Sequence, residues 1–164
     1  MSVKVADRKE SSVQYITTAI EIEVKVINLL IKMSRKYRQF FEAKLGELSI
    51  ELVSCCEKAN NIYVNSEERF LERDKLLTRA KQSLMALDVQ LGVCQNVLRE
   101  NLAYTFEDSH GESFTSTKAK AKLDKMSEQL GLLVSEEKKL LEGAIKKNKE
   151  RMRDFAVAHS TKLS

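Results

Sequence analysis

The sequence predicts an all-α protein, and three observations support this prediction. The 164-residue chain has no proline and only five glycines, so the residues that most often interrupt helices are scarce. Apolar residues recur three and four positions apart over long stretches, which places them on one face of a helix. A chain of this length is most simply one domain. We therefore expect residues 1–164 to form a single up-down-up-down antiparallel four-helix bundle.

The first predicted helix covers residues 11–33 and carries two apolar stripes on opposite sides. A helix on the outside of a bundle needs one apolar face, so two faces predict burial on both. We assign the second stripe to contact with another subunit in a ring-like homo-oligomer. The alternative is that it caps an irregular core or covers a long loop. The first stripe holds Val13, Ile16, Ile20, Val24, Ile27 and Ile31, and the second holds Ile22, Val26, Leu29 and Met33.

The second and third predicted helices cover residues 36–62 and 66–100. The link 63–67 is so short that these helices are expected to be antiparallel neighbours. Asn65, with Glu68 three residues later, is a plausible capping pair for the third helix. The apolar stripes are Phe41, Leu45, Leu48, Leu52, Cys55, Ala59 and Ile62 in the second helix, and Phe70, Leu77, Ala80, Leu84, Leu87, Leu91, Cys94 and Leu98 in the third.

The fourth predicted helix covers residues 118–153. The preceding residues 101–117 contain Ser, Thr, Gly and acids without a period, and we expect a mobile loop there, either throughout or after a helical extension at its beginning. Residues 154–164 are expected to form a flexible tail. The pair Glu136–Glu137 is expected to lie on an exposed turn. The apolar positions of this helix are Leu123, Met126, Leu130, Leu133, Leu140, Leu141, Ala144 and Ile145.

Several features predict a soluble cytoplasmic protein with no membrane partner. The charged N-terminal residues 1–12 do not resemble a signal peptide, and the best apolar run, residues 24–31, is too short and too polar to cross a bilayer. Three cysteines is an odd number, and no metal-ligand spacing is present. We therefore expect free thiols in a reducing compartment.

The residues give no indication of an active site, so we expect a protein that is not an enzyme and has no metal and no cofactor. A di-metal bundle needs two Glu-x-x-His pairs, whereas Glu107 and His110 form the single one and His159 has none. The glycines are isolated, so no phosphate-binding loop is present. Arg73 stands in the apolar stripe of the third helix. Its guanidinium either pairs with an acid such as Glu57 or binds a phosphate or a partner's carboxylate.

The stretch "GAIKKNKERMR" (143–153) ends the fourth helix with five bases and one acid. The helix dipole favours cations in a last turn and would account for two or three of them. The remainder favours contact with several phosphates, although without interleaved aromatic residues we do not expect sequence readout. Bundle topology predicts two basic poles, one at the turn near 34–38 and one combining the C-terminal bases with the N-terminus. The candidate phosphate-contacting residues are Lys146, Lys147, Lys149, Arg151, Arg153, Arg8, Lys9, Arg35, Lys36 and Arg38.

Two stretches resemble a known family. "KANNIYVNSEERFLERDKLLTRAKQSLMALDVQLGV" (58–93) is similar to the second-to-third helix junction of small bacterial four-helix-bundle proteins. These include the accessory variability determinant (Avd) proteins of diversity-generating retroelements and the ribosomal-RNA intervening-sequence proteins. "GAIKKNKER" (143–151) resembles the family's closing motif, with Ala144 where that motif has Trp. The basic-then-Ser segment "RKESS" (8–12) is similar to the opening of the Avd proteins.

The resemblance implies a non-enzymatic accessory subunit of a diversity-generating retroelement, forming a basic homopentamer. Such a subunit would bind the reverse transcriptase and the template RNA or its cDNA and support mutagenic cDNA synthesis. The alternative that the residues leave open is a protein-interaction scaffold with no role in nucleic-acid binding.

Overall fold

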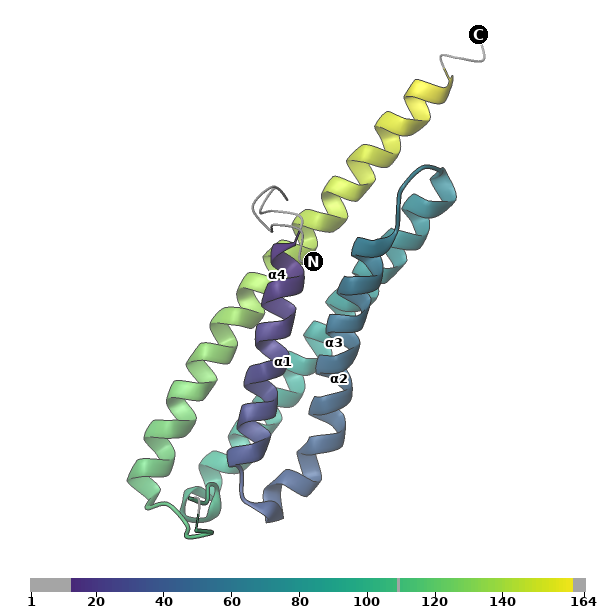
Figure 1. The fold of residues 1–164 in the computed structure, drawn as a ribbon. Helices are drawn as coiled ribbons and strands as arrows, with labels where there is room; N and C mark the ends of the chain where they lie inside the picture. The colour runs from purple at the N-terminus through teal and green to yellow at the C-terminus, as the bar shows by residue number, and fades with distance from the viewer. Residues whose placement is uncertain (1–12, 109, 161–164) are drawn as a thin grey trace, which may run out of the picture.

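The computed structural model describes residues 13–108 and 110–160, and these residues form an antiparallel four-helix bundle (Figure 1). Within them no β-strand forms, and the extended pairing is limited to two isolated bridges. The all-α bundle predicted from the sequence is confirmed. Its helices are α1 (Gln14–Lys32), α2 (Arg35–Asn61), α3 (Glu67–Glu100) and α4 (Ser116–Ser160), with a short 3-10 helix η3 (Leu102–Tyr104) between the last two.

The bundle core is built mainly from leucine side chains that all four helices point inward. The stripes predicted for α2 and α3 are buried almost throughout, as their spacing of three and four residues requires. The residues whose side chains are shielded most completely include Leu45 and Leu52 of α2, Leu77 and Leu87 of α3, and Leu141 of α4.

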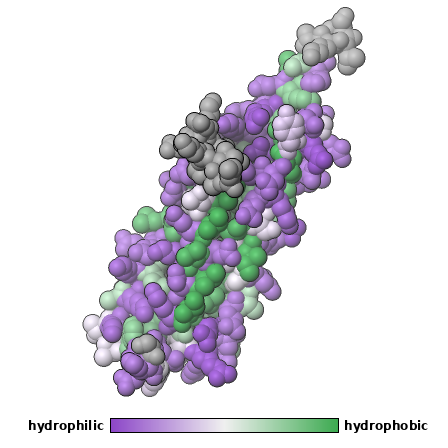
Figure 2. Space-filling model, viewed as in Figure 1, coloured by the Kyte–Doolittle hydropathy of each residue, from purple (hydrophilic) through white to green (hydrophobic). Residues whose placement is uncertain are grey.

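The two stripes of α1 are the reverse of what was predicted. Ile22, Val26, Leu29 and Met33 are at most 2% exposed and lie in the core of a single chain, so they cannot contact another subunit. The stripe of Ile20, Val24, Ile27 and Ile31 faces outward instead. Figure 2 shows it as part of a hydrophobic band along the front of the molecule, over α1. Both stripes have the same spacing, so periodicity could not decide which one meets the core.

The helices differ greatly in length, and this decides which parts of the molecule project. α1 has 19 residues and α4 has 45, or about 28 Å and about 68 Å at 1.5 Å per residue. As a result, the α2–α3 hairpin and the second half of α4 continue past the beginning of α1 (Figure 1). Among the described residues, three helices rather than four form that end of the bundle.

α4 does not end near residue 153, and the flexible tail predicted from residue 154 is wrong for residues 154–160. The helix continues through Ser160 because its last turns have packing partners. The ring of Phe155 lies 5.7 Å from that of Phe70 on α3, and His159 stacks on Phe155 at 4.0 Å between centroids. Isolated aromatic residues after a charged stretch did not indicate this packing.

The connection between α3 and α4 is more structured than the irregular loop that was predicted. Phe106 is fully buried, and its backbone pairs with Met33 in an isolated bridge. The backbone N–H of Ser34 donates to Thr105 O at 2.9 Å, and the Ser34 hydroxyl donates to Tyr104 O at 2.7 Å. The α1–α2 turn and the α3–α4 connection are therefore joined at one end of the bundle. Three aromatic residues without a regular spacing, Tyr104, Phe106 and Phe114, are too weak a pattern to predict this.

Two local predictions need correction. The N-cap of α3 is Ser66, whose hydroxyl accepts from Arg69 N at 3.3 Å, rather than Asn65. Glu137 is fully buried and does not lie on an exposed turn, because it occupies a core position of α4 between Val134 and Leu141. The prediction of free cysteines is confirmed, since Cys55, Cys56 and Cys94 are all buried and unpaired.

No helix among the described residues is both long enough and apolar enough to span a bilayer. This agrees with the shortness of the apolar runs in the sequence.

Candidate nucleic-acid interface

The five bases predicted to contact phosphates lie on the part of α4 that projects beyond the start of α1. All five side chains are exposed. None of them takes part in the ion pairs that the described residues make with one another. These five residues, which form the basic face of α4, are Lys146, Lys147, Lys149, Arg151 and Arg153.

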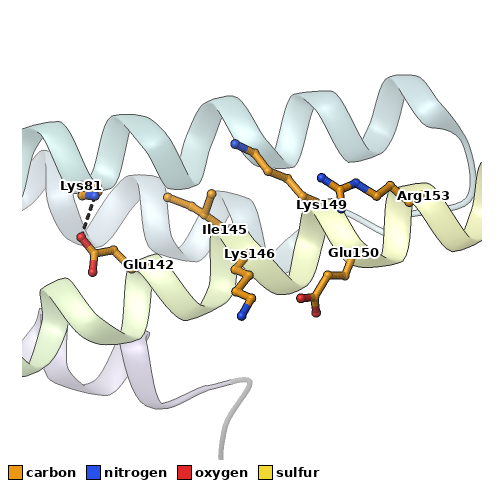
Figure 3. A pocket seen from close by; sticks show the side chains of 7 residues that line it. All are labelled: Lys81, Glu142, Ile145, Lys146, Lys149, Glu150 and Arg153. Atoms are coloured by element: carbon orange, nitrogen blue, oxygen red, sulfur yellow. Dashed lines mark ion pairs between the residues drawn. The ribbon is translucent and has the colours of Figure 1, made fainter.

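Three of these bases line an open groove of about 350 Å³ beside α4. One end of the groove is closed by an ion pair in which Lys81 Nζ of α3 lies 2.8 Å from Glu142 Oε1. Lys149 and Arg153 point toward the α2–α3 hairpin, whereas Lys146 and Glu150 point toward the other side of α4 (Figure 3). Because Glu142 is already paired with Lys81, the groove lining retains three bases, Lys146, Lys149 and Arg153, against one acid, Glu150. The groove is therefore electropositive and suited to an anionic ligand.

The helix dipole does not account for these bases. Its effect is confined to the last turn of a helix, and α4 ends at Ser160. Arg153 is thus about two turns, and Lys146 about four turns, from that end. The dipole would have explained two or three of these bases only if the helix had ended near residue 153. With the longer helix, the helix dipole no longer explains any of the five bases.

The bases predicted at the α1–α2 turn lie at the other end of the bundle (Figure 1). Arg35 and Lys36 are exposed at the start of α2, with Lys36 Nζ 5.6 Å from the centroid of the Tyr37 ring. Arg38 lies 3.8 Å from Glu42, one helical turn away. Among the described residues the predicted separation into two basic poles therefore holds. Arg8 and Lys9 lie outside the described residues.

The sequence reasoning missed a group of lysines at the start of α4. Lys118, Lys120, Lys122 and Lys125 occur within eight residues, and Lys32 lies at the end of α1 at the same pole. The density of lysine in this segment was the signal that could have revealed them.

The exposed stripe of α1 has the spacing of a helix that packs against other helices. Ile20, Val24, Ile27 and Ile31 follow one another at four, three and four residues, which is the repeat of a coiled-coil seam. Every member is β-branched, and β-branched residues at both alternating positions favour assemblies of more than two helices. These four residues, and not the stripe that the sequence assigned to subunit contact, are the apolar side chains that α1 leaves exposed on a single chain.

A polar cluster lies inside the bundle near the start of α1. Glu137 accepts from the Cys56 thiol with Sγ 3.7 Å from Oε1. Burial raises the pKa of Glu137 to about 8, and burial followed by the charge of Glu137 raises that of Cys56 far above its ordinary value. The Tyr15 pKa is also raised by burial, against a lowering effect of the nearby Arg73 guanidinium. The predicted ion pair of Arg73 with Glu57 is not among those formed by the described residues.

The cluster does not have the composition of a metal centre. In residues 13–108 and 110–160, no three His, Cys, Asp or Glu side chains gather in a way that could hold a metal ion. Its thiol lies beside a carboxyl rather than a base, which opposes formation of a thiolate.

Comparisons of the chain with protein-family models, with curated proteins and with solved structures find no match. The bundle fold, the basic face of α4 and the exposed stripe of α1 are thus the observations on which a function can rest.

Proposed function

We propose that this protein is a non-enzymatic accessory subunit that binds RNA or cDNA through the basic face of α4 and assembles with copies of itself. The observation that supports it most directly is the group of five exposed bases, free of ion pairs among the described residues, on a helix that projects beyond the start of α1. Several lysines and arginines along one helix can contact successive phosphates without reading the base sequence.

Assembly would multiply this surface. A cyclic homo-oligomer, with the α1 stripe of each copy packed against its neighbours, buries Ile20, Val24, Ile27 and Ile31. Each copy would then present its own α4 face to the same ligand. The gain in affinity from several linked contacts exceeds that of any single one.

The protein partner is proposed from the resemblance to the Avd proteins in residues 58–93 and 143–151. It implies that the subunit associates with the reverse transcriptase of a diversity-generating retroelement and supports mutagenic cDNA synthesis. A reverse-transcriptase gene beside a near-duplicated repeat in the neighbouring genome would support this partner. A neighbourhood without either feature would contradict it.

Binding of a single-stranded RNA, measured by fluorescence anisotropy over a series of salt concentrations, tests the proposal. We expect the wild type to bind with an affinity that falls steeply with salt. Changing Lys146, Lys147, Lys149, Arg151 and Arg153 together to Gln should reduce the slope of log affinity against log salt concentration by about 3.5, at roughly 0.7 per lost contact with a single strand.

The matched control removes five other exposed lysines, outside residues 146–153: Lys44, Lys58, Lys75, Lys138 and Lys139. Its net charge equals that of the α4 variant, but we expect the salt slope to stay close to that of the wild type. A wild type that does not bind RNA even in dilute buffer would contradict the proposed function. Equal slopes for the two variants would remove the basic face of α4 from it.

The second candidate, a protein-interaction scaffold without nucleic-acid binding, is favoured by the outer face of α3. Met85, Val89 and Val93 are exposed there at intervals of four residues. A partner helix could pack along such a face. The RNA measurement separates the two candidates, because a scaffold would show no salt-dependent binding.

A further inference from the structure

Three lysines lie at the pole of the bundle opposite the basic face of α4. Lys32 is the last residue of α1, and Lys118 and Lys122 are four residues apart on one face at the start of α4. They come together because the chain directly after Lys32 is joined to the α3–α4 connection: Met33 pairs with Phe106.

Two aromatic rings hold the ammonium groups in place. Lys118 Nζ lies 4.2 Å from the centroid of Phe114, and Lys122 Nζ lies 4.4 Å from Phe114 and 5.1 Å from Phe106. The rings are themselves fixed: they lie 6.3 Å apart, and Phe114 N donates to Phe106 O at 3.0 Å. Because a ring face attracts a cation, the two charges are positioned before any ligand arrives.

The charges of this cluster are not balanced by the acids around it. None of its lysines takes part in the ion pairs among the described residues. The nearby Asp108 carboxylate feels the charge of Lys118, but one of its oxygens accepts from the backbone N–H groups of His110 at 2.8 Å and Glu112 at 2.9 Å. The hydrogen bonds of Asp108 thus join it to the backbone of its own loop and not to a lysine of the cluster.

Like charges within the cluster oppose one another. The pKa of Lys122 is lowered by burial first, and then by the charges of Lys32 and Lys118. Lys118 also lies in the first turn of α4, where the helix dipole disfavours a cation. Such an arrangement costs folding free energy, and an anion that contacts all three ammonium groups would remove that cost.

We propose that Lys32, Lys118 and Lys122 form a phosphate-binding site, and that it holds a backbone phosphate of the nucleic acid bound by this protein. The identity of the ligand rests on the proposed function, whereas the site itself rests on the three lysines and two rings. The predicted bases Arg35 and Lys36 lie at the same pole and extend the positive surface around it.

The test compares two triple variants of equal charge. The site variant is Lys32→Gln, Lys118→Gln and Lys122→Gln, and the control is Lys44→Gln, Lys120→Gln and Lys138→Gln, whose residues are exposed. In the RNA titration the site variant should lose affinity by about tenfold in dilute buffer and lower the salt slope by about 2. The control should change the affinity less than twofold. Equal losses in the two variants would overturn the site.

A second measurement tests phosphate binding at the site in the absence of RNA. The lysines are dimethylated with a ¹³C label, and their NMR signals are followed while inorganic phosphate is added. We expect the Lys122 signal to shift in the wild type and its pKa to rise, since a bound anion offsets the charges of Lys32 and Lys118. An unmoved signal would overturn the site.

The two results separate this inference from the proposed function. A wild type that does not bind RNA, with a Lys122 signal that responds to phosphate, would contradict the proposed function and the nucleic-acid ligand but support a phosphate site. RNA binding that depends on residues 146–153 and is unaffected by the site variant would support the proposed function and contradict the three-lysine site. If the site variant fails to fold, Lys118→Gln alone replaces it, because Lys118 is exposed.

Discussion

Glu137 shows at the level of one residue how the core can determine the chemistry of a side chain. The sequence places it in a charged stretch beside Glu136, yet its carboxyl is completely shielded from solvent. One oxygen accepts from Cys56 and the other has no hydrogen-bonding partner within the protein. Burial therefore raises its pKa from 4.5 to about 8, so the group is mostly neutral at pH 7.

This shift predicts that Glu137 lowers stability as the pH rises. An unfolded chain releases the Glu137 proton above about pH 4.5, whereas the folded protein retains it until about pH 8. The folded state binds more protons in this window, so its stability falls with increasing pH. In the Glu137→Gln variant the side chain cannot ionise. We expect the variant to be more stable than the wild type at pH 8, by on the order of 4 kcal/mol, with the difference shrinking toward pH 5.

Urea unfolding of both proteins at pH 5, 6.5 and 8 measures this difference. Glu128→Gln is the control, because Glu128 is exposed on α4 and its charge is not among the causes of the Glu137 shift, so its substitution should leave the pH dependence as it is. Parallel stability curves for the wild type and Glu137→Gln would show that the buried carboxyl does not retain its proton.

At the level of the element, the main difference between the predicted and the observed helices is the position of the end of α4. The predicted boundaries of α2 and α3 lie within one residue of the observed ones, because long apolar stripes and a short link leave little freedom. The end of α4 was misplaced by seven residues, since Phe155 finds its partner on α3 and no periodic stripe leads to it. That difference removes the dipole as an explanation for the bases near residue 150.

The beginning of α3 gives a prediction about stability. Ser66 is the residue that caps the helix, by accepting from Arg69 N, so Ser66→Ala should lower the free energy of unfolding by about 1 kcal/mol. Asn65→Ala should change it by less than about 0.5 kcal/mol, because Asn65 is exposed and is not the cap. Urea unfolding of the two variants measures both values. A larger loss for Asn65→Ala than for Ser66→Ala would contradict the observed cap.

At the level of the whole molecule, the exposed stripe of α1 is the surface that we expect to join copies of the chain. Exposed apolar side chains scattered singly are common on proteins. Here they follow one seam with coiled-coil spacing, and the hydrophobic band over α1 is visible in Figure 2. The opposite stripe, which holds Ile22, Val26, Leu29 and Met33, is buried in the core of the single chain.

This assignment predicts how the oligomer responds to a charge on either stripe. Val24→Glu with Ile27→Glu should dissociate the oligomer and leave the bundle folded, because both positions are exposed within one chain. Val26→Glu should instead unfold the bundle, since it buries an unpaired carboxylate in the core. Light scattering gives the mass, and circular dichroism gives the helix content.

Leu132→Glu is the control for the double variant, because Leu132 is exposed on α4 and lies outside the stripe. It should keep the mass of the wild type. A wild type that is already monomeric, or a double variant with unaltered mass, would remove the α1 stripe from any assembly.

The sequence by itself determined the all-α class, the number of helices, their antiparallel order and most of the core, because each follows from spacing along one chain. It also revealed the bases of α4, which are visible as composition. Only the tertiary structure decided which stripe of α1 meets the core, that Glu137 is buried, and that Lys32 lies near enough to Lys122 for its charge to lower the Lys122 pKa. These facts depend on contacts between residues far apart in the chain, and a helical period specifies the direction of a face but not the neighbour that it meets.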